Sequence, residues 1–406
     1  MIFSLILLIH SVTASFQGGA VMPDGKVDKV VSADDKATGD WHAPVWGVDV
    51  NVDFAPDWKA LQQWNNATVG VGLSYWNMGH EMLGHAIAPY IYMNVPLVRL
   101  PHFELGLRPG LGAAFMTKTY RNTVSEENMF VTLAGANSSI GSVTNLYFPE
   151  EFYMNFPLVK GWSISLAGGW YHISNGSIRQ PNSGYNIFGG KLGVSKVIEA
   201  QDTVDRCAED RPTGLRSTSS EKAKKWSVAV AGTMGGRQVY YRDQQTFLIS
   251  SMHAAAYWHA HPIFRLGGGV DVFYDGAYVQ RETYFGKTNL ALAQPGDCWR
   301  VGVSVQPEFV VGNFTLGLHV GAYMYDPVKE LEPQWHEDGL PQERLEKPIF
   351  YAYDLLNAGS AGHPDGWLYT EVVLRYHLPW HVFVQAMMKS HLTKVEFVSV
   401  GLGFYY

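Results

Sequence analysis

A histidine and a serine stand two residues apart in the segment Gly169–Asn186 (GWYHISNGSIRQPNSGYN). Residues i and i+2 of a β-strand point to the same face, so His172 and Ser174 would lie side by side if this segment is a strand. A serine hydroxyl becomes a nucleophile when an adjacent base takes its proton, and an imidazole is a suitable base. The pair therefore predicts acyl transfer to water by a serine hydrolase.

The residues before the pair alternate as a membrane strand does. Across 162–174 the even positions carry most of the large apolar side chains, and the odd positions are mainly small or polar. The apolar face of a barrel strand in a membrane meets lipid. His172 and Ser174 are therefore predicted to point out of the barrel, at its outer rim.

The next predicted strand, 185–197, should supply a third polar group. If the hairpin is symmetric about Arg179, Asn186 faces His172 within contact distance. Its carboxamide could accept from the imidazole and fix the tautomer. The side chain of Asn175 and the amide of Gly176, in the turn beyond the serine, are the predicted oxyanion donors.

At these residues the chain resembles a known family, the outer-membrane lipid A 3-O-deacylases (PagL-like), which are also described as acyloxyacyl hydrolases. That family carries a His-x-Ser-Asn segment followed by a Pro-Asn-x-Gly turn. The matching residues here are His172, Ser174 and Asn175, then Pro181, Asn182 and Gly184.

The resemblance implies that His172 and Ser174 are catalytic and that Asn182 belongs to the substrate-binding turn. It also implies a barrel enzyme that removes an ester-linked acyl chain from lipid A or a related glycolipid in the outer leaflet. The third catalytic residue of the best-known members is a Glu, and its place falls on Asn186.

The amide at this position affects the expected activity. Asn186 can orient the imidazole, but it carries no negative charge to stabilise an imidazolium. The same exchange in a serine protease costs about 10⁴ in rate, mostly through the wrong tautomer. Activity is therefore expected to be weak, unless Glu150 or Glu151 on the neighbouring strand supplies a carboxylate.

The composition of the 406 residues favours a barrel. Charged residues make up 17 %, aromatics 14 %, and there are 42 glycines. A net charge of −7 argues against nucleic acid as a partner. After the N-terminus there is no apolar run long enough for a helical membrane span. The sequence therefore predicts an all-β, transmembrane, antiparallel up-and-down β-barrel of the outer-membrane type, with about 14–16 strands.

The alternation places strands along the whole chain. The predicted ranges are 15–22, 45–54, 67–76, 86–96, 102–116, 141–158, 162–174, 185–197, 226–240, 247–259, 263–275, 299–312, 313–324, 367–378, 380–390 and 395–406. We expect one barrel domain over 15–406, with a long polar connection at 198–225 in the periplasm. The last strand alternates up to Tyr406, an ending typical of strands that the barrel-assembly machinery recognises.

The N-terminal residues 1–14 (MIFSLILLIHSVTA) resemble a secretory signal peptide, with Val12 and Ala14 at the small-residue positions before cleavage. The alternative is a first apolar strand. Cys207 and Cys298 are predicted on opposite sides of the membrane, too far apart to bond.

The other motifs in the sequence give weaker evidence of function. GHEMLGH (79–85) spaces its histidines one residue too widely for a helical zinc site, and LGGGVDVFYD (266–275) is a strand, so no metal and no cofactor is predicted. Five histidines are predicted to be lumenal polar groups rather than metal ligands: His253, His259, His261, His319 and His377.

The predicted partners are lipid A or lipopolysaccharide as substrate and the lipids of a Gram-negative outer membrane. Two other functions stay open. The first is a non-catalytic barrel, a channel or structural protein with a degenerate site. The second is a soluble lipid-binding sandwich. A channel needs an open lumen, whereas Glu104, Arg108, Glu371 and Arg375 are inward positions that could fill it with ion pairs.

Overall fold

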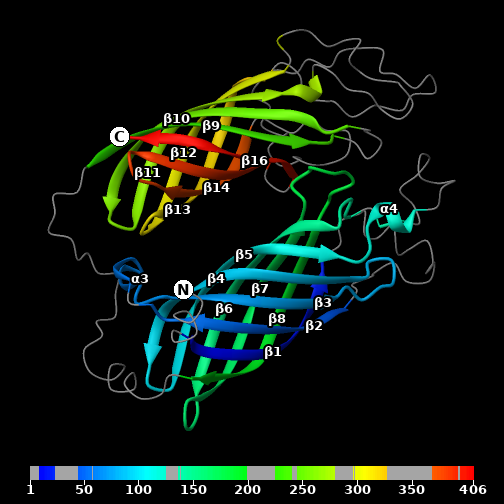
Figure 1. Cartoon of the computed structure of the whole chain (residues 1–406), viewed down its shortest axis with the longest axis vertical. Helices are drawn as coiled ribbons and strands as arrows, with labels where there is room; N and C mark the ends of the chain where they lie inside the picture. The colour runs from blue at the N-terminus through cyan, green and yellow to red at the C-terminus, as the bar shows by residue number, and fades with distance from the viewer. Residues whose placement is uncertain are drawn as a thin grey trace. The chain divides into compact units, whose positions relative to one another are not determined.

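The computed structural model describes residues 9–22, 44–56, 58–124, 136–137, 139–198, 225–239, 245–278, 296, 298–326, 368–391 and 394–406. In these ranges, sixteen strands form two closed antiparallel barrels of eight strands each (Figure 1). None of the helices within these ranges has the length and apolar character that a membrane crossing requires.

The first barrel closes when its first strand pairs with its eighth, so that Ser11 lies opposite Val197. Its strands are β1 (Ile9–Val21), β2 (Pro44–Phe54), β3 (Thr68–Asn77), β4 (His85–Leu100), β5 (Phe103–Met116), β6 (Thr144–Pro157), β7 (Trp162–Ser174) and β8 (Tyr185–Val197). Two short helices, α3 (Lys59–Gln63) and α4 (Tyr120–Thr123), lie in the connections.

The second barrel closes in the same way, between its last strand and its first, with Gly401 opposite Thr233. Its strands are β9 (Trp226–Arg237), β10 (Phe247–His261), β11 (Phe264–Asp275), β12 (Trp299–Val311), β13 (Phe314–Tyr325), β14 (Leu368–His377), β15 (Val382–His391) and β16 (Lys394–Tyr405). A single 3-10 turn, η1 (Gly276–Tyr278), follows β11.

The prediction of an all-β antiparallel barrel protein with about 14–16 strands is confirmed. The prediction of one barrel over 15–406 is wrong, because β8 pairs back to β1 and β9 pairs with β16. Alternation sets which side chains share a face but not which strand edges meet, so it could not distinguish these closures.

The structure describes residues 9–14 of the predicted signal peptide. Strand β1 begins at Ile9, and Val12 pairs with Val52 on one side and Lys196 on the other. Cleavage after Ala14 would remove part of the strand that closes the first barrel. Residues 9–14 thus have the strand conformation of the alternative, a first apolar strand. The connection predicted at 198–225 and Cys207 lie outside the described residues, apart from 198 and 225, while Cys298 is buried.

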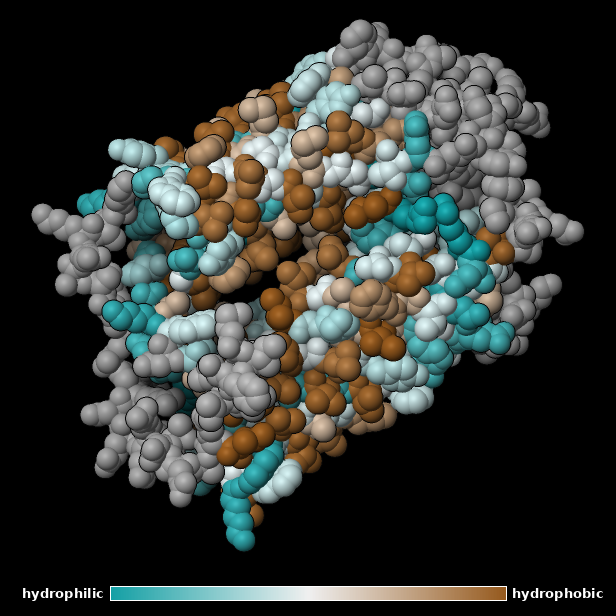
Figure 2. Space-filling view, viewed as in Figure 1, coloured by the Kyte–Doolittle hydropathy of each residue, from teal (hydrophilic) through white to brown (hydrophobic). Residues whose placement is uncertain are grey.

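Many large apolar side chains are exposed on the strands of both barrels, and the face in Figure 2 shows them in brown. Large exposed side chains on the strands include Phe16, Val50, Leu73, Ile91, Phe152, Phe188 and Leu192 in the first barrel, and Val228, Met252, Val305, Phe314, Leu402 and Phe404 in the second. An apolar belt of this kind suits contact with lipid tails.

The lumen of the first barrel is filled by charged and aromatic side chains. Lys191 Nζ lies 2.9 Å from Asp49 Oδ2 and 2.7 Å from Glu151 Oε1, and Arg108 Nη1 lies 3.2 Å from Glu151 Oε2. All four residues are buried. The ring of Tyr90 lies against the Lys191 ammonium group. Each charge is therefore paired, as burial requires.

The second lumen is filled in the same way. Arg265 Nε lies 2.6 Å from Glu308 Oε2, and Arg375 pairs with the same carboxylate. Lys389 and Arg300 both pair with Glu396. The predicted inward positions of Arg375 and Glu371 are confirmed by their burial, and the ion pairs occupy the space that an open pore would need.

Candidate active site on β7 and β8

The hairpin of β7 and β8 positions the predicted catalytic residues. Tyr171 and Ile173 point into the first barrel, where the Tyr171 ring lies 5.3 Å from Lys191 Nζ and Ile173 belongs to the buried apolar cluster. Side chains alternate along a strand, so His172 and Ser174 project from the outward face. The pairing of His172 with Asn186 is the one that the sequence predicts.

The three side chains form a hydrogen-bonded chain. His172 Nε2 lies 2.9 Å from Ser174 Oγ, and His172 Nδ1 lies 2.8 Å from Asn186 Oδ1. His172 is 8 % exposed and Ser174 only 1 %. Both imidazole nitrogens are thus engaged in the geometry expected of a nucleophile, its base and an orienting group.

The Trp170 indole determines which nitrogen of His172 carries the proton in this series of hydrogen bonds. Its Nε1 donates to Asn186 Oδ1 at 3.0 Å, and its ring stacks on His172 with centroids 5.2 Å apart. An indole nitrogen can only donate, so the Asn186 atom that it meets is the oxygen. His172 Nδ1 must then carry its proton, which leaves Nε2 free to accept the proton of Ser174.

The sequence did not identify Trp170 as a functional residue. The sequence could have indicated Trp170 through its spacing, because it precedes His172 by two residues and therefore shares the outward face. Phe148 was missed as well; it lies opposite His172 in the register, with ring centroids 6.2 Å apart.

The turn after Ser174 is held by its asparagines. The backbone N–H of Asn175 donates to Asn182 Oδ1 at 2.9 Å, and Asn175 Nδ2 donates to Ser142 Oγ at 2.8 Å. Gly176, the second predicted oxyanion donor, has a left-handed φ of 63°. Asn182 therefore has a structural contact in the turn, while the oxyanion roles stay predictions.

Gly184 lies close to His172 and Ser174. It has a φ of 75°, and a Cβ there would lie 3.1 Å from both His172 Cε1 and Ser174 Cβ and 2.9 Å from the Ile173 carbonyl oxygen. Glycine is the residue that allows both this backbone conformation and this approach.

The two glutamates of β6 do not replace Asn186. Glu151 lies in the lumen with Lys191 and Arg108, so the suggestion that it could serve the site is wrong. Glu150 lies on the outward face opposite Trp170 in the register. The orienting partner of His172 Nδ1 is Asn186.

The GHEMLGH segment forms a turn that leads into β4. His80 Nδ1 accepts from the backbone N–H of Met82 at 3.2 Å, and His85 Nδ1 lies 3.0 Å from the Tyr75 hydroxyl. Neither histidine belongs to a potential metal cluster of the described residues. The prediction that LGGGVDVFYD is a strand is confirmed by β11.

Comparisons with known proteins agree with the resemblance. Residues 46–195 match the family model "Lipid A 3-O-deacylase (PagL)", and residues 224–355 match "Acyloxyacyl hydrolase, C-terminal domain". The first range contains the whole hydrogen-bonded chain of β7 and β8. No curated protein matches the chain.

Among solved structures, variants of the Rhodopseudomonas blastica porin are similar at low identity. One is 9 % identical with a TM-score of 0.17, over 98 % of this chain and 99 % of the porin. Another is 10 % identical with a TM-score of 0.18, over 97 % and 99 %. The two family models together match well over half of the chain, one in each barrel. Residues 46–195 are therefore similar to lipid A 3-O-deacylases of the PagL type, and residues 224–355 are similar to the C-terminal domain of acyloxyacyl hydrolases.

Proposed function

We propose that this protein is an outer-membrane serine esterase that hydrolyses an ester-linked acyl chain of lipid A, or of a related glycolipid, in the outer leaflet of a Gram-negative bacterium. Ser174 is the nucleophile, His172 is the general base and Asn186 orients the imidazole. The single observation that carries this proposal is the chain of hydrogen bonds from Ser174 through His172 to Asn186.

The proposed reaction starts with the proton of His172 on Nδ1, so that Nε2 can accept the proton of Ser174. Ser174 Oγ attacks the ester carbonyl carbon while His172 Nε2 takes the hydroxyl proton. The tetrahedral intermediate collapses, and the glycolipid alkoxide leaves with the proton from Nε2. Water then attacks the acyl-serine, with His172 again as base, and the fatty acid is released from Ser174. Asn175 and Gly176 are the proposed donors to the oxyanion, on the turn that Asn182 holds.

The outward position of the site supports a membrane-lipid substrate. His172, Ser174 and Asn186 lie on a face whose other members, such as Phe188 and Leu192, are exposed and apolar. Polar groups on a lipid-facing surface are costly and usually functional. Trp170 and Phe148 flank the imidazole and provide an aromatic surface for an acyl chain.

The filled lumens argue against the channel alternative. Buried ion pairs such as Arg108 with Glu151 and Arg265 with Glu308 occupy the interiors of the two barrels. We therefore expect no ion conductance above background in planar bilayers, which distinguishes this protein from an open porin.

The direct test is mass spectrometry of the products released from purified lipid A by the protein in detergent. The unaltered protein should release fatty acid, and Ser174→Ala or His172→Ala should each abolish the release. Ser163→Ala is the matched control, because Ser163 lies at the other end of β7. Release that is unchanged in both site variants would exclude the proposed mechanism, and lipid A of unchanged mass in cells with and without the protein would exclude the proposed substrate.

A further inference from the structure

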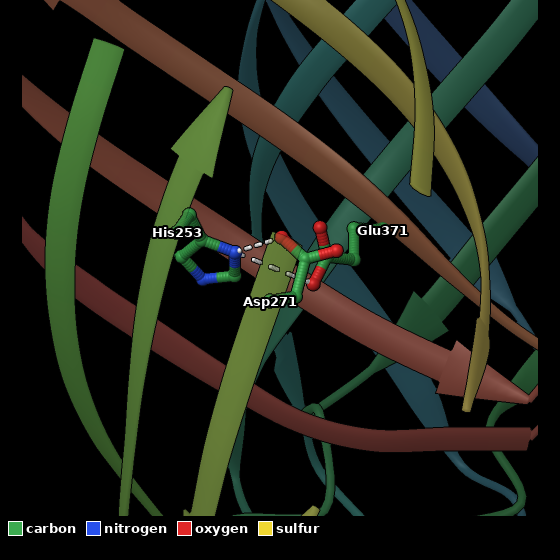
Figure 3. A group of neighbouring side chains, drawn as sticks. All are labelled: His253, Asp271 and Glu371. Atoms are coloured by element: carbon green, nitrogen blue, oxygen red, sulfur yellow. Dashed lines mark hydrogen bonds and ion pairs between the residues drawn. The ribbon is translucent and has the colours of Figure 1, made fainter. Parts of the chain in front are cut away.

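Three buried side chains converge inside the second barrel. They are His253 on β10, Asp271 on β11 and Glu371 on β14 (Figure 3). His253 Nδ1 lies 2.8 Å from Asp271 Oδ1 and 4.0 Å from Glu371 Oε1. One potential ligand atom from each residue lies within 4.8 Å of the other two.

Each of the three side chains also forms a hydrogen bond with a residue outside the cluster. His253 Nε2 lies 2.7 Å from Ser251 Oγ, the second Asp271 oxygen accepts from the Tyr369 hydroxyl at 2.6 Å, and Glu371 Oε2 lies 3.3 Å from His319 Nδ1. The atoms that face one another are His253 Nδ1 and Asp271 Oδ1, which share a hydrogen bond, and Glu371 Oε1. Metal ligands in proteins are oriented by such outer hydrogen bonds.

The free oxygen of Glu371 is the feature that ordinary packing does not explain. Glu371 Oε1 is buried without a hydrogen-bond partner in the described part of the chain, and the side chain is 0 % exposed. Lys389, which lies opposite Glu371 in the β14–β15 register, is paired with Glu396. A buried carboxylate oxygen with no donor is costly, and a cation between Glu371 and Asp271 would remove that cost.

We propose that His253, Asp271 and Glu371 bind one divalent transition-metal ion of the Zn²⁺ type. One imidazole nitrogen and two carboxylate oxygens form a mixed ligand set that suits Zn²⁺ and leaves a further position for water. The ion would link β14 to β10 and β11, strands that are not all neighbours in the sheet. It would therefore stabilise the second barrel from within.

A second Ser–His–Asp site is the competing interpretation of the same residues, since Ser251, His253 and Asp271 are hydrogen-bonded in that order. However, Ser251 Oγ is also bonded to Thr233 Oγ1 at 2.6 Å and is only 3 % exposed, inside a filled lumen. A hydrolytic triad also gives no role to Glu371. The metal site uses all the convergent atoms, so we favour it.

The test uses the purified full chain in detergent, stripped with a chelator and then dialysed against Zn²⁺. Elemental analysis should find one tightly bound Zn²⁺ per chain that is lost in Glu371→Gln and in His253→Gln. The controls are His377→Gln, which alters a histidine of the same barrel outside the cluster, and Glu104→Gln, which removes a carboxylate of the first barrel. Both controls should bind as the unaltered protein does.

A second measurement covers variants that fail to fold. Tyr369→Phe keeps all three ligands and removes the hydroxyl that donates to Asp271, so we expect Zn²⁺ affinity to fall by about 10- to 100-fold. Tyr257→Phe, which removes a buried tyrosine hydroxyl from the same barrel, should leave the affinity unchanged. The absorption of bound Co²⁺ should report nitrogen and oxygen ligands without sulfur. No bound metal in the unaltered protein, or binding that is equal in all variants, would overturn the proposal.

Discussion

Trp170 and His172 donate to the same atom, the Oδ1 of Asn186, from 3.0 Å and 2.8 Å. The shared acceptor orients the amide, and the oriented amide selects the Nδ1–H tautomer of His172. In the proposed mechanism an asparagine can then prepare the base for Ser174, although it cannot supply the negative charge of a carboxylate. We therefore expect the hydrogen bond from Trp170 to compensate in part for the absent carboxylate.

Trp170→Phe should lower the rate of acyl release by about 3- to 10-fold. The change keeps an aromatic ring against His172 but removes one hydrogen bond, which contributes about 0.5–1.5 kcal/mol. Trp162→Phe, on the same strand and face, is the matched control and should have no effect. The measurement is the initial rate with purified lipid A; equal rates in the two variants would show that the indole N–H is not needed.

Asn186→Glu should raise the rate by about tenfold, because a hydrogen bond to a charged group exceeds a neutral one by about 1–1.5 kcal/mol. Asn186→Leu should lower the rate well below that of the unaltered protein, since it removes the acceptor of His172 Nδ1. The same release assay serves for both. A Leu variant as active as the unaltered protein would contradict the orienting role.

Gly184→Ala should lower activity by about 10²-fold, the effect of a displacement of about 1 Å at a catalytic group. Its new Cβ would crowd His172 and Ser174, and the φ of 75° adds backbone strain. Gly168→Ala on β7 is the control, because the nearest atom to its Cβ would lie at 3.6 Å. If both variants are equally active, the close approach of Gly184 does not position the pair.

Lys191→Met should destabilise the first barrel by about 3–5 kcal/mol, because it leaves Asp49 and Glu151 buried without their shared cation. Lys196→Met, on the same strand but on its outer face, should cost about 1 kcal/mol or less. Urea unfolding of the full chain in detergent measures both. Similar midpoints for the two variants would argue against a tightly paired lumen.

The sequence was sufficient for the candidate site because the site is local. Period-2 alternation set the outward face of β7, and the short hairpin set the partner of His172. The sequence could not predict the role of Trp170, because the direction of a tryptophan N–H on an apolar face cannot be inferred from the residues around it. Glu151 was equally undecided until its lumenal partners were known.

The sequence by itself thus determined the strands, their faces and the pairing of His172 with Asn186, since each depends on residues close together in the chain. Only the tertiary structure decided that β8 returns to β1 and β16 to β9, which makes two barrels where one was expected. It also decided that Asp271 and Glu371, a hundred positions apart, face one another in one lumen. The physical reason is that the closure of a sheet depends on which distant edges pair, and an alternating pattern leaves every edge chemically alike.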